Sequence, residues 1–269
     1  MADNFLINSG VQLGKHQLYE DHYNPKLLQP IARSLCRQQQ ALQHFLGADI
    51  WTAYEVSWLD AQGKPCVVAL EFIFPADSSH LIESKSFKYY LNSFNQTRIK
   101  SIELLKNTLA SDLSATAGGL VCVREYNIPA ADGVSGQVEL DNTPLFEPSY
   151  KPRPEYLQPG TQTVVEVLAS HLLKTNCPVT GQPDWASIWI GYEGACINHE
   201  GLLAYIVSYR QHQDFHENCV EQIFCDLWQR CAPERLWVYA RYTRRGGLDI
   251  NPFRTSHAME APSLRGFRQ

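Results

Sequence analysis

The chain has 269 residues, enough for one large domain or two ordinary ones, and 44% of them are hydrophobic against 19% charged. These values are typical of globular proteins and predict a chain that folds throughout. The formal net charge of −5 argues against a broad basic surface, so we expect no polymeric RNA or DNA partner. The chain contains neither an apolar run long enough to span a membrane nor a signal-peptide pattern at its start, which predicts a soluble cytoplasmic protein.

Eight cysteines are spread along the chain. A chain of this size without a secretory signal does not need disulfides, so we expect free thiols. The sequence contains no Cys-x-x-Cys pair, and a helix would scatter Cys219, Cys225 and Cys231 around its surface. We therefore expect no metal site.

The first half is predicted to contain two strands, a helix and a further strand. Residues 31–46 are either a helix or an ordered loop, because a polar run interrupts their apolar spacing. Residues 54–59 and 67–74 are rich in β-branched and aromatic residues on either side of a turn, which predicts a hairpin. Apolar residues recur at helical spacing over 99–113, with Thr97 as the expected cap, and a short strand is expected at 120–126.

Prolines and glycines are dense over residues 127–162, which predicts a connector between an N-terminal module, 1–126, and a C-terminal module, 163–269. The second half shows the same order of elements. Strands are expected at 187–192 and 202–209, a helix around 220–227 and a strand at 236–243, while the spacing over 164–173 is helical.

Both halves contain the pattern Tyr-x-x-Ser-aromatic-x-Gln, which begins at Tyr90 and at Tyr205 and precedes a helix in each. We interpret this as a duplication and predict two similar antiparallel α+β modules. The polar residues near the pattern differ between the halves, at 83–88 in the first and 214–217 in the second. If the modules pack together, one composite site can draw on both.

Cys177 lies in a stretch that has no counterpart in the first half. Pro178, Gly181 and Pro183 exclude a regular helix here, so the cysteine lies on a constrained turn. Asp184 follows seven residues later and can face the same cavity, where the pair would supply a nucleophile and a proton donor. The alternative is that Cys177 is an inert, partly buried thiol and that Asp184 caps a turn.

Asp214 and Glu217 have the spacing of a capping box ahead of a helix. On that interpretation Glu217 is a structural cap and His216 is an ordinary residue of the first helical turn. The alternative is that both face a ligand.

Four cations have a similar ambiguity. Lys85 and Lys88 fit either a phosphate site or a solvated helix face, and Arg244 and Arg245, which precede two glycines, fit a basic hairpin turn equally well. The chain has no Gly-x-Gly-x-x-Gly after a strand, so a nicotinamide cofactor would need these side chains for its phosphates.

Four motifs taken together resemble one enzyme family. They are Glu83-Ser84-Lys85-Ser86-x-Lys88-x-Tyr90, Cys177-Pro178-x-Thr180-Gly181-Gln182-Pro183-Asp184, Asp214-Phe215-His216-Glu217 and Arg244-Arg245-Gly246-Gly247. In this order they are similar to QueF, the NADPH-dependent nitrile reductases that act on 7-cyano-7-deazaguanine in queuosine biosynthesis, in its longer two-module form. The resemblance covers about residues 50–255.

The resemblance implies an α+β tunnelling fold (T-fold), with two tandem modules of antiparallel sheet and helices packed on one face. It implies that Cys177 attacks the nitrile carbon to form a thioimide and that Asp184 donates a proton. The residues implied to contact the deazaguanine are Ile82, Glu83, Ser84, His216 and Glu217. The residues implied to contact NADPH are Ser84, Lys85, Arg245 and Gly246. Residues 164–173 would be a strand leading to Cys177, against their helical spacing.

The predicted function is the reduction of the nitrile to the aminomethyl group of 7-aminomethyl-7-deazaguanine. We expect a homodimer with a small deazapurine substrate and with no direct nucleic-acid or membrane partner. Two alternatives remain open: a cysteine hydrolase or amidase acting on a purine-like substrate, and a non-catalytic T-fold protein that binds a purine.

Overall fold

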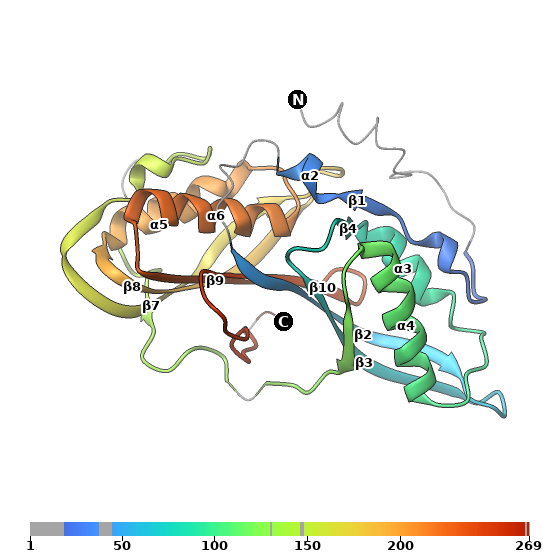
Figure 1. Cartoon of the computed structure of the whole chain (residues 1–269). Coiled ribbons are helices and arrows are strands. Elements are labelled where there is room, and N and C mark those ends of the chain that lie inside the picture. Colours follow the sequence, from blue (N-terminus) through green and yellow to red (C-terminus); the bar gives the residue numbers. More distant parts are fainter. Residues whose placement is uncertain (1–18, 38–44, 130, 146–147, 267, 269) are drawn as a thin grey trace. The chain divides into compact units, whose positions relative to one another are not determined.

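The computed structural model describes residues 19–37, 45–129, 131–145, 148–266 and 268. The chain divides into two compact units (Figure 1). Unit 1 contains Met1–Gln38, Ile50–Asn127 and Arg244–Asp249, and unit 2 contains Gln39–Asp49, Ile128–Thr243 and Ile250–Gln269. Among the described residues, no helix is both long enough and apolar enough to cross a lipid bilayer.

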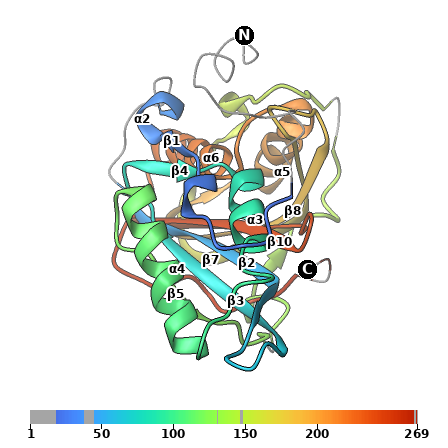
Figure 2. The same ribbon diagram turned by 90° about the vertical axis from the view of Figure 1, so that its right-hand side faces the viewer.

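Unit 1 is built on strands in the order β5-β3-β2. These strands are β2 (Leu46–Leu59), β3 (Pro65–Pro75) and β5 (Cys122–Glu125). Along β3, Leu70, Phe72 and Phe74 are buried and alternate with more exposed residues, as in a sheet with one covered face. The helices α3 (Ser84–Asn92) and α4 (Ile102–Ala117) cover that face (Figures 1 and 2). The predicted hairpin, helix and final strand are confirmed.

The rest of unit 1 is a small two-stranded sheet with two short helices. It comprises η1 (Pro25–Leu27), β1 (Pro30–Ala32), α2 (Arg33–Cys36) and β4 (His80–Ile82), and β1 pairs with β4 in an antiparallel ladder. The segment predicted as one helix or an ordered loop, 31–46, therefore includes a short strand and a single helical turn. Its residues 38–44 lie outside the described residues.

Helix α4 begins after Ser101 and not after Thr97. The Ser101 hydroxyl accepts a hydrogen bond from the Leu104 amide at 3.2 Å, which satisfies one of the free amides at the helix start. The predicted cap at Thr97 is wrong because its hydroxyl has other partners: it accepts from the Tyr23 amide and donates to the Ser93 carbonyl.

Unit 2 is built on strands in the order β10-β9-β8-β7-β6. They are β6 (Val138–Glu139), β7 (Pro159–Asn176), β8 (Pro183–Ile197), β9 (Arg235–Tyr242) and β10 (Leu248–Thr255). Strands β7 to β10 are antiparallel, and β6 runs parallel to β7. The helices are η2 (Pro154–Tyr156), α5 (His199–Ser208), η3 (Tyr209–Gln211) and α6 (His216–Cys231).

Helices α5 and α6 lie side by side on one face of these strands and enclose the core of unit 2 (Figure 1). Ile188 and Ile190 of β8 pack there against Ile223 and Phe224 of α6. The predicted fold class, α+β with antiparallel strands and helices on one face of each sheet, is confirmed in both units.

One prediction in unit 2 is wrong, and the choice left open for residues 164–173 is decided in favour of the strand that the family resemblance implies. Residues 202–209 were expected to form a strand, but they belong to α5 and its extension, because Asn198 caps a helix there and Leu202, Tyr205 and Ile206 are buried at helical spacing. Residues 164–173 lie within β7 and not in a helix. An irregularity between Ser170 and Leu173 shifts the strand register and breaks the alternation that would have revealed it.

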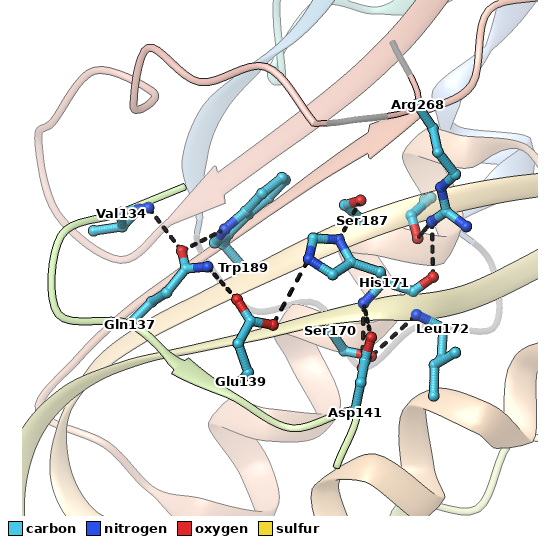
Figure 3. Close-up of polar contacts among 11 residues, drawn as sticks. Val134, Gln137, Glu139, Asp141, Ser170, His171, Leu172, Ser187, Trp189 and Arg268 are labelled. Carbon is cyan, nitrogen blue, oxygen red and sulfur yellow. Dashed lines mark hydrogen bonds and ion pairs between the residues drawn. The ribbon is translucent and has the colours of Figure 1, made fainter. Parts of the chain in front are cut away.

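Side chains from residues 134–141 fasten this segment to β7 and β8 (Figure 3). The Gln137 side-chain oxygen accepts from the Val134 amide at 2.7 Å and from the Trp189 indole at 2.9 Å. Asp141 accepts from the His171 amide at 3.0 Å and from the Ser170 hydroxyl at 2.7 Å. This part of the Pro- and Gly-rich stretch is therefore held by side-chain hydrogen bonds as well as by β6.

The repeated Tyr-x-x-Ser pattern has the same structural role in both units. Tyr90 donates to Asp112 of α4 and Tyr205 donates to Asp226 of α6, each at 2.6 Å. In both units the serine hydroxyl donates to the tyrosine carbonyl, again at 2.6 Å. The helices that receive the tyrosine hydrogen bond, α4 and α6, are each 16 residues long. The tyrosine of the repeated pattern thus joins the two helices of each unit by a hydrogen bond.

Replacing Tyr205 by Phe is expected to lower the free energy of unfolding by about 1–3 kcal/mol, because the buried Asp226 carboxylate loses one of its two side-chain donors and keeps only Gln222. Burial raises the pKa of Tyr205 well above its usual range, so the phenol stays a donor at any physiological pH. Urea unfolding measures the change. Tyr23→Phe is the control, since the exposed Tyr23 also donates to a helix aspartate, Asp112, and should cost less. Equal stability of Tyr205→Phe and the parent would contradict this account.

Candidate active site

Cys177 lies at the start of the turn that joins β7 to β8. In the register of this hairpin, Thr175 faces Asp184. The Cys177 amide donates to the Gln182 carbonyl at 2.9 Å, and the Cys177 carbonyl accepts from the Gly181 amide at 3.0 Å. Gly181 has φ of +67°, a left-handed conformation that glycine adopts without strain. These contacts close the turn.

The hairpin register places Cys177 and Asp184 at the two ends of one turn. Thr175 pairs with Asp184, and Cys177 follows two residues later, one residue beyond the end of β7. Cys177 is partly exposed, whereas Asp184 is 3% exposed. Cys177 therefore lies outside the hydrophobic core of unit 2, and its partial exposure agrees both with a nucleophile and with the inert, partly buried thiol of the alternative.

The same strand end anchors the segment that precedes α6. The Asn176 amide donates to the His212 carbonyl at 2.8 Å, and Asn176 forms a parallel bridge with Gln213. Because α6 begins only three residues after Gln213, this contact brings His216 and Glu217 to the end of the hairpin. The structure therefore brings together the two motifs predicted in the second half.

His216 connects the hairpin to the last two strands of unit 2. Its ring stacks on Tyr242 of β9, with centroids 3.6 Å apart and planes 5° from parallel. Its Nε2 lies 3.4 Å from Asp184 Oδ2, and its Nδ1 lies 3.4 Å from the Ile250 carbonyl oxygen of β10. Because a carbonyl only accepts, Nδ1 carries the hydrogen in this contact, and one further proton can lie between Nε2 and Asp184. The pair is suited to holding and releasing a proton.

Glu217 is not a capping residue. Phe215, which has no polar side-chain atom, occupies the N-cap position of α6, and Asp214 accepts instead from the Phe215 amide and the Asn218 side chain. The capping-box interpretation is therefore wrong. Glu217 is 3% exposed and lies in the first helical turn, where the helix dipole favours a negative charge.

A second thiol, Cys219, lies in the electrostatic environment of the same acids. Burial raises its pKa well above the ordinary value, and the charges of Asp214, Glu217 and Asp184 raise it further. Cys219 is therefore a neutral thiol at physiological pH and a poor nucleophile. Burial and nearby negative charge therefore distinguish Cys219 from the partly exposed Cys177, a difference that the sequence alone does not show.

In unit 1, the predicted substrate motif lies where β4 ends and α3 begins. Ile82 is the last residue of β4, and Glu83 is the N-cap of α3. Its two carboxylate oxygens accept from the amides of Lys85 and Ser86, at 2.8 and 2.6 Å. Glu83 thus has a structural role that the sequence did not suggest, and each oxygen keeps a lone pair for a ligand.

The Arg-Arg-Gly-Gly motif forms a tight turn beside α3. The Arg245 amide donates to the Leu248 carbonyl at 2.8 Å, and Gly246 has φ of +60°. A side chain at Gly246 would begin 3.6 Å from Lys88 Cδ, and the Arg244 guanidinium lies 4.6 Å from the centre of the Tyr54 ring. The interpretation of this motif as a turn is correct. The turn also brings the backbone at Gly246 close to Lys88 of the motif at 83–88.

The predicted site residues therefore form two groups, each assembled within its own unit. Unit 2 brings together Cys177, Asp184, His216 and Glu217, and unit 1 brings together residues 82–88 and 244–246. One composite site drawn from both groups stays a prediction. Sequence reasoning missed the two partners of His216, Tyr242 and Ile250, because only strand pairing and helix packing place them there.

Comparison with known proteins agrees with the four motifs. A family model described as nitrile reductase, 7-cyano-7-deazaguanine-reductase N-term, matches residues 19–124, and a QueF-like protein model matches residues 183–261. A protein of Saccharophagus degradans named NADPH-dependent 7-cyano-7-deazaguanine reductase is 52% identical over 268 residues, which cover 97% of this chain and 100% of that one. Proteins with the same name from Desulfotalea psychrophila and Bordetella avium are 50% and 51% identical, over 98% and 97% of this chain and 99% of each relative.

These matches place the chain among the nitrile reductases. More specifically, it belongs to the QueF family, in the two-module form, and the family predicted from the motifs is confirmed.

The difference in exposure between the thiols predicts their reactivity. Under native conditions, iodoacetamide should label Cys177 at least about tenfold faster than Cys219, because Cys219 is fully buried and its pKa is raised. Peptide mapping by mass spectrometry measures both rates, and labelling after urea unfolding gives the reference for each thiol. Similar native rates at the two positions would show that the described burial does not hold in solution.

Proposed function

We propose that this chain reduces the nitrile of 7-cyano-7-deazaguanine to an aminomethyl group with NADPH, through a thioimide on Cys177. The predicted reductase class and the predicted cofactor are confirmed by the family and by the names of the relatives. They leave the hydrolase and the non-catalytic alternatives without support. The observation that carries the assignment of residues is the partly exposed Cys177 at the start of the turn that leads to the buried Asp184, whose carboxylate lies 3.4 Å from His216.

The first step joins the Cys177 sulfur to the nitrile carbon. A nitrile is a weak electrophile, so a soft nucleophile such as a thiolate is needed to convert it to a C=N group that accepts hydride. The pKa of an ordinary cysteine is near 8.5, and only a few per cent would be ionised at neutral pH. The thiol proton passes to the Asp184–His216 pair, and the pair returns a proton to the nitrile nitrogen. The product is a neutral thioimide.

NADPH supplies two hydrides in sequence when it is bound. After the first, the bond between carbon and Cys177 breaks and the sulfur leaves, which gives an imine that takes the second hydride. A proton from the Asp184–His216 pair completes each step at nitrogen. An imine in contact with water would hydrolyse to an aldehyde, so the residues around Cys177 must exclude water during turnover.

Glu217 and His216 would hold the base. A carboxylate accepts two parallel hydrogen bonds from the ring N–H and the amino group of a guanine-like edge. The burial of Glu217 makes such bonds stronger than they would be in water and penalises a ligand without that edge. Ile82, Glu83 and Ser84 are further residues that we propose to contact the base.

The residues of unit 1 fit a dinucleotide that binds without a Gly-rich Rossmann loop. Lys88 runs beside Gly246, whose missing side chain leaves backbone open to a ligand, and Arg244 is held on the Tyr54 ring. Ser84, Lys85, Arg245 and Gly246 would contact NADPH, with Lys88 and Arg244 adding positive charge for its phosphates.

We place the protein in the cytoplasm as a homodimer with no direct nucleic-acid or membrane partner. The free cysteines of the described part of the chain fit a reducing compartment, and the net charge of −5 disfavours nucleic acid. Support for a dimer comes from unit 1, where β5 ends the strand order and Val67 and Leu120 are 67% and 86% exposed.

The covalent step is tested by intact mass spectrometry with 7-cyano-7-deazaguanine and without NADPH. The protein should gain the mass of one nitrile ligand, and Cys177→Ala should gain none. Asp184→Asn should form the adduct at least about 100-fold more slowly, because a general acid typically contributes this much. Cys66→Ala, which removes another partly exposed thiol, is the control and should form the adduct like the parent. An adduct on Cys177→Ala would refute the assignment of the nucleophile.

The cofactor contacts are tested by kinetics. Arg244→Ala and Lys88→Ala should each raise KM for NADPH about tenfold, the size of one lost charge-assisted hydrogen bond, with little change in KM for the nitrile. The loss of absorbance at 340 nm follows both substrates. Lys106→Ala is the control, since Lys106 is a cation of the same unit that is paired with Glu103 and Glu125 on the protein. An unchanged KM for NADPH in both variants would remove these cations from the cofactor site.

A further inference from the structure

Arg254 of β10 holds two carboxylates inside unit 2. Its Nη2 lies 2.7 Å from Asp49 Oδ1 and 2.7 Å from Glu221 Oε1, and its Nε lies 3.1 Å from the same Glu221 oxygen. Its Nη1 donates to the carbonyls of Ala48 and Phe253 at 3.2 and 2.8 Å. The arginine side chain is 0% exposed and each carboxylate is 1% exposed.

Stability does not explain this arrangement. Taking three charges out of water is costly, and hydrophobic residues of similar volume stabilise such positions as well or better. Burial alone would lower the pKa of Arg254, yet the two carboxylates hold it above its ordinary value, so the arginine stays charged. A guanidinium differs from apolar packing in that its donors have fixed directions. The arrangement is therefore suited to setting a geometry.

The geometry concerned is that of the start of α6. Glu221 lies one helical turn after Glu217 and on the same face of the helix. Arg254 lies four residues after Ile250, whose carbonyl meets the His216 ring. Helix α6 is thus attached to β10 at two successive points, the first at His216 and the second one turn further along.

Apolar packing alone would leave this part of the helix less well defined. The inner face of α6 contributes Cys219, Val220 and Ile223 to the core of unit 2. Hydrophobic contacts are non-directional, so a core of the right size tolerates small rotations and shifts of a helix. The directed bonds from Arg254 to Glu221 do not tolerate them.

We propose that Arg254 is a positioning residue for the base-binding end of α6. Arg254 joins Glu221 to β10 and to Asp49. It thereby sets how the first two turns of α6 are rotated about the helix axis and where they lie along it, and so directs Glu217 and His216 toward the deazaguanine. The inference rests on the proposed contacts of those two residues with the base. A displacement of about 1 Å at such a site can cost about 100-fold in rate.

The test uses the full chain and steady-state kinetics. Arg254→Lys keeps the buried positive charge but loses the two-pronged contact with Glu221. It should raise KM for 7-cyano-7-deazaguanine about tenfold and leave KM for NADPH within about twofold, because the cofactor contacts belong to unit 1. The matched control is Tyr205→Phe, which removes a buried hydrogen bond to Asp226 near the other end of α6. It should lower the melting temperature without a change in either KM.

A second variant separates positioning from stability. The combined replacement Asp49→Leu, Glu221→Leu and Arg254→Met removes all three charges and should remain about as stable as the parent. Its KM for the nitrile should still be raised. Parent-like KM in a folded triple variant would overturn the proposal. If the triple variant does not fold, the comparison of Arg254→Lys with Tyr205→Phe decides, and equal KM values for those two would overturn it.

Glu217→Ala distinguishes failure of this inference from failure of the proposed function. If Glu217→Ala leaves KM for the nitrile unchanged, the proposed base contact is wrong and the role of Arg254 falls with it. If Glu217→Ala raises KM while Arg254→Lys does not, the base contact stands and only the positioning role is refuted.

Discussion

The group of site residues in unit 2 depends on the register between β7 and β8. Because Thr175 faces Asp184, the turn between the strands has a thiol at its start and a carboxylate just beyond its end. A slip of one residue would turn the carboxylate to the opposite face. The last residue of β7 also anchors the segment before α6, through the bond from Asn176 to His212. One strand pairing therefore sets the positions of the thiol, the acid and His216.

The two units share a structural framework but differ in their candidate site residues. Both keep the tyrosine and aspartate pair that joins their helices, so the framework is the same. The polar residues at the helix starts differ mainly in environment. Glu103 of α4 and Glu217 of α6 each lie second in a 16-residue helix, but Glu103 is exposed and paired with Lys106, whereas Glu217 is buried. Burial, more than residue type, makes the second glutamate suited to binding a ligand edge.

The sequence predictions are accurate where a structure depends on neighbouring residues and fail where it depends on contacts between distant parts of the chain. The strand around 67–74 was predicted because alternation and β-branched residues are local properties. The strand prediction for residues 202–209 is wrong because a largely buried helix of aromatic and branched residues looks like a strand in a short window. The capping-box prediction places the start of α6 one residue too early. The same sequence is compatible with a helix that begins after Asp214 or after Phe215. The pairing of Gln213 with Asn176 of β7 favours the second, which is the start observed.

The sequence by itself determined the family, the two α+β modules and the candidate residues, because motifs, spacing and composition are written along the chain. The tertiary structure decided which of these residues meet and what each one contacts. Tyr242 and Ile250 reach His216, and Arg254 reaches Asp49 and Glu221, only through strand pairing and helix packing between distant segments. Such contacts leave no local pattern, because their partners are set by the path of the whole chain.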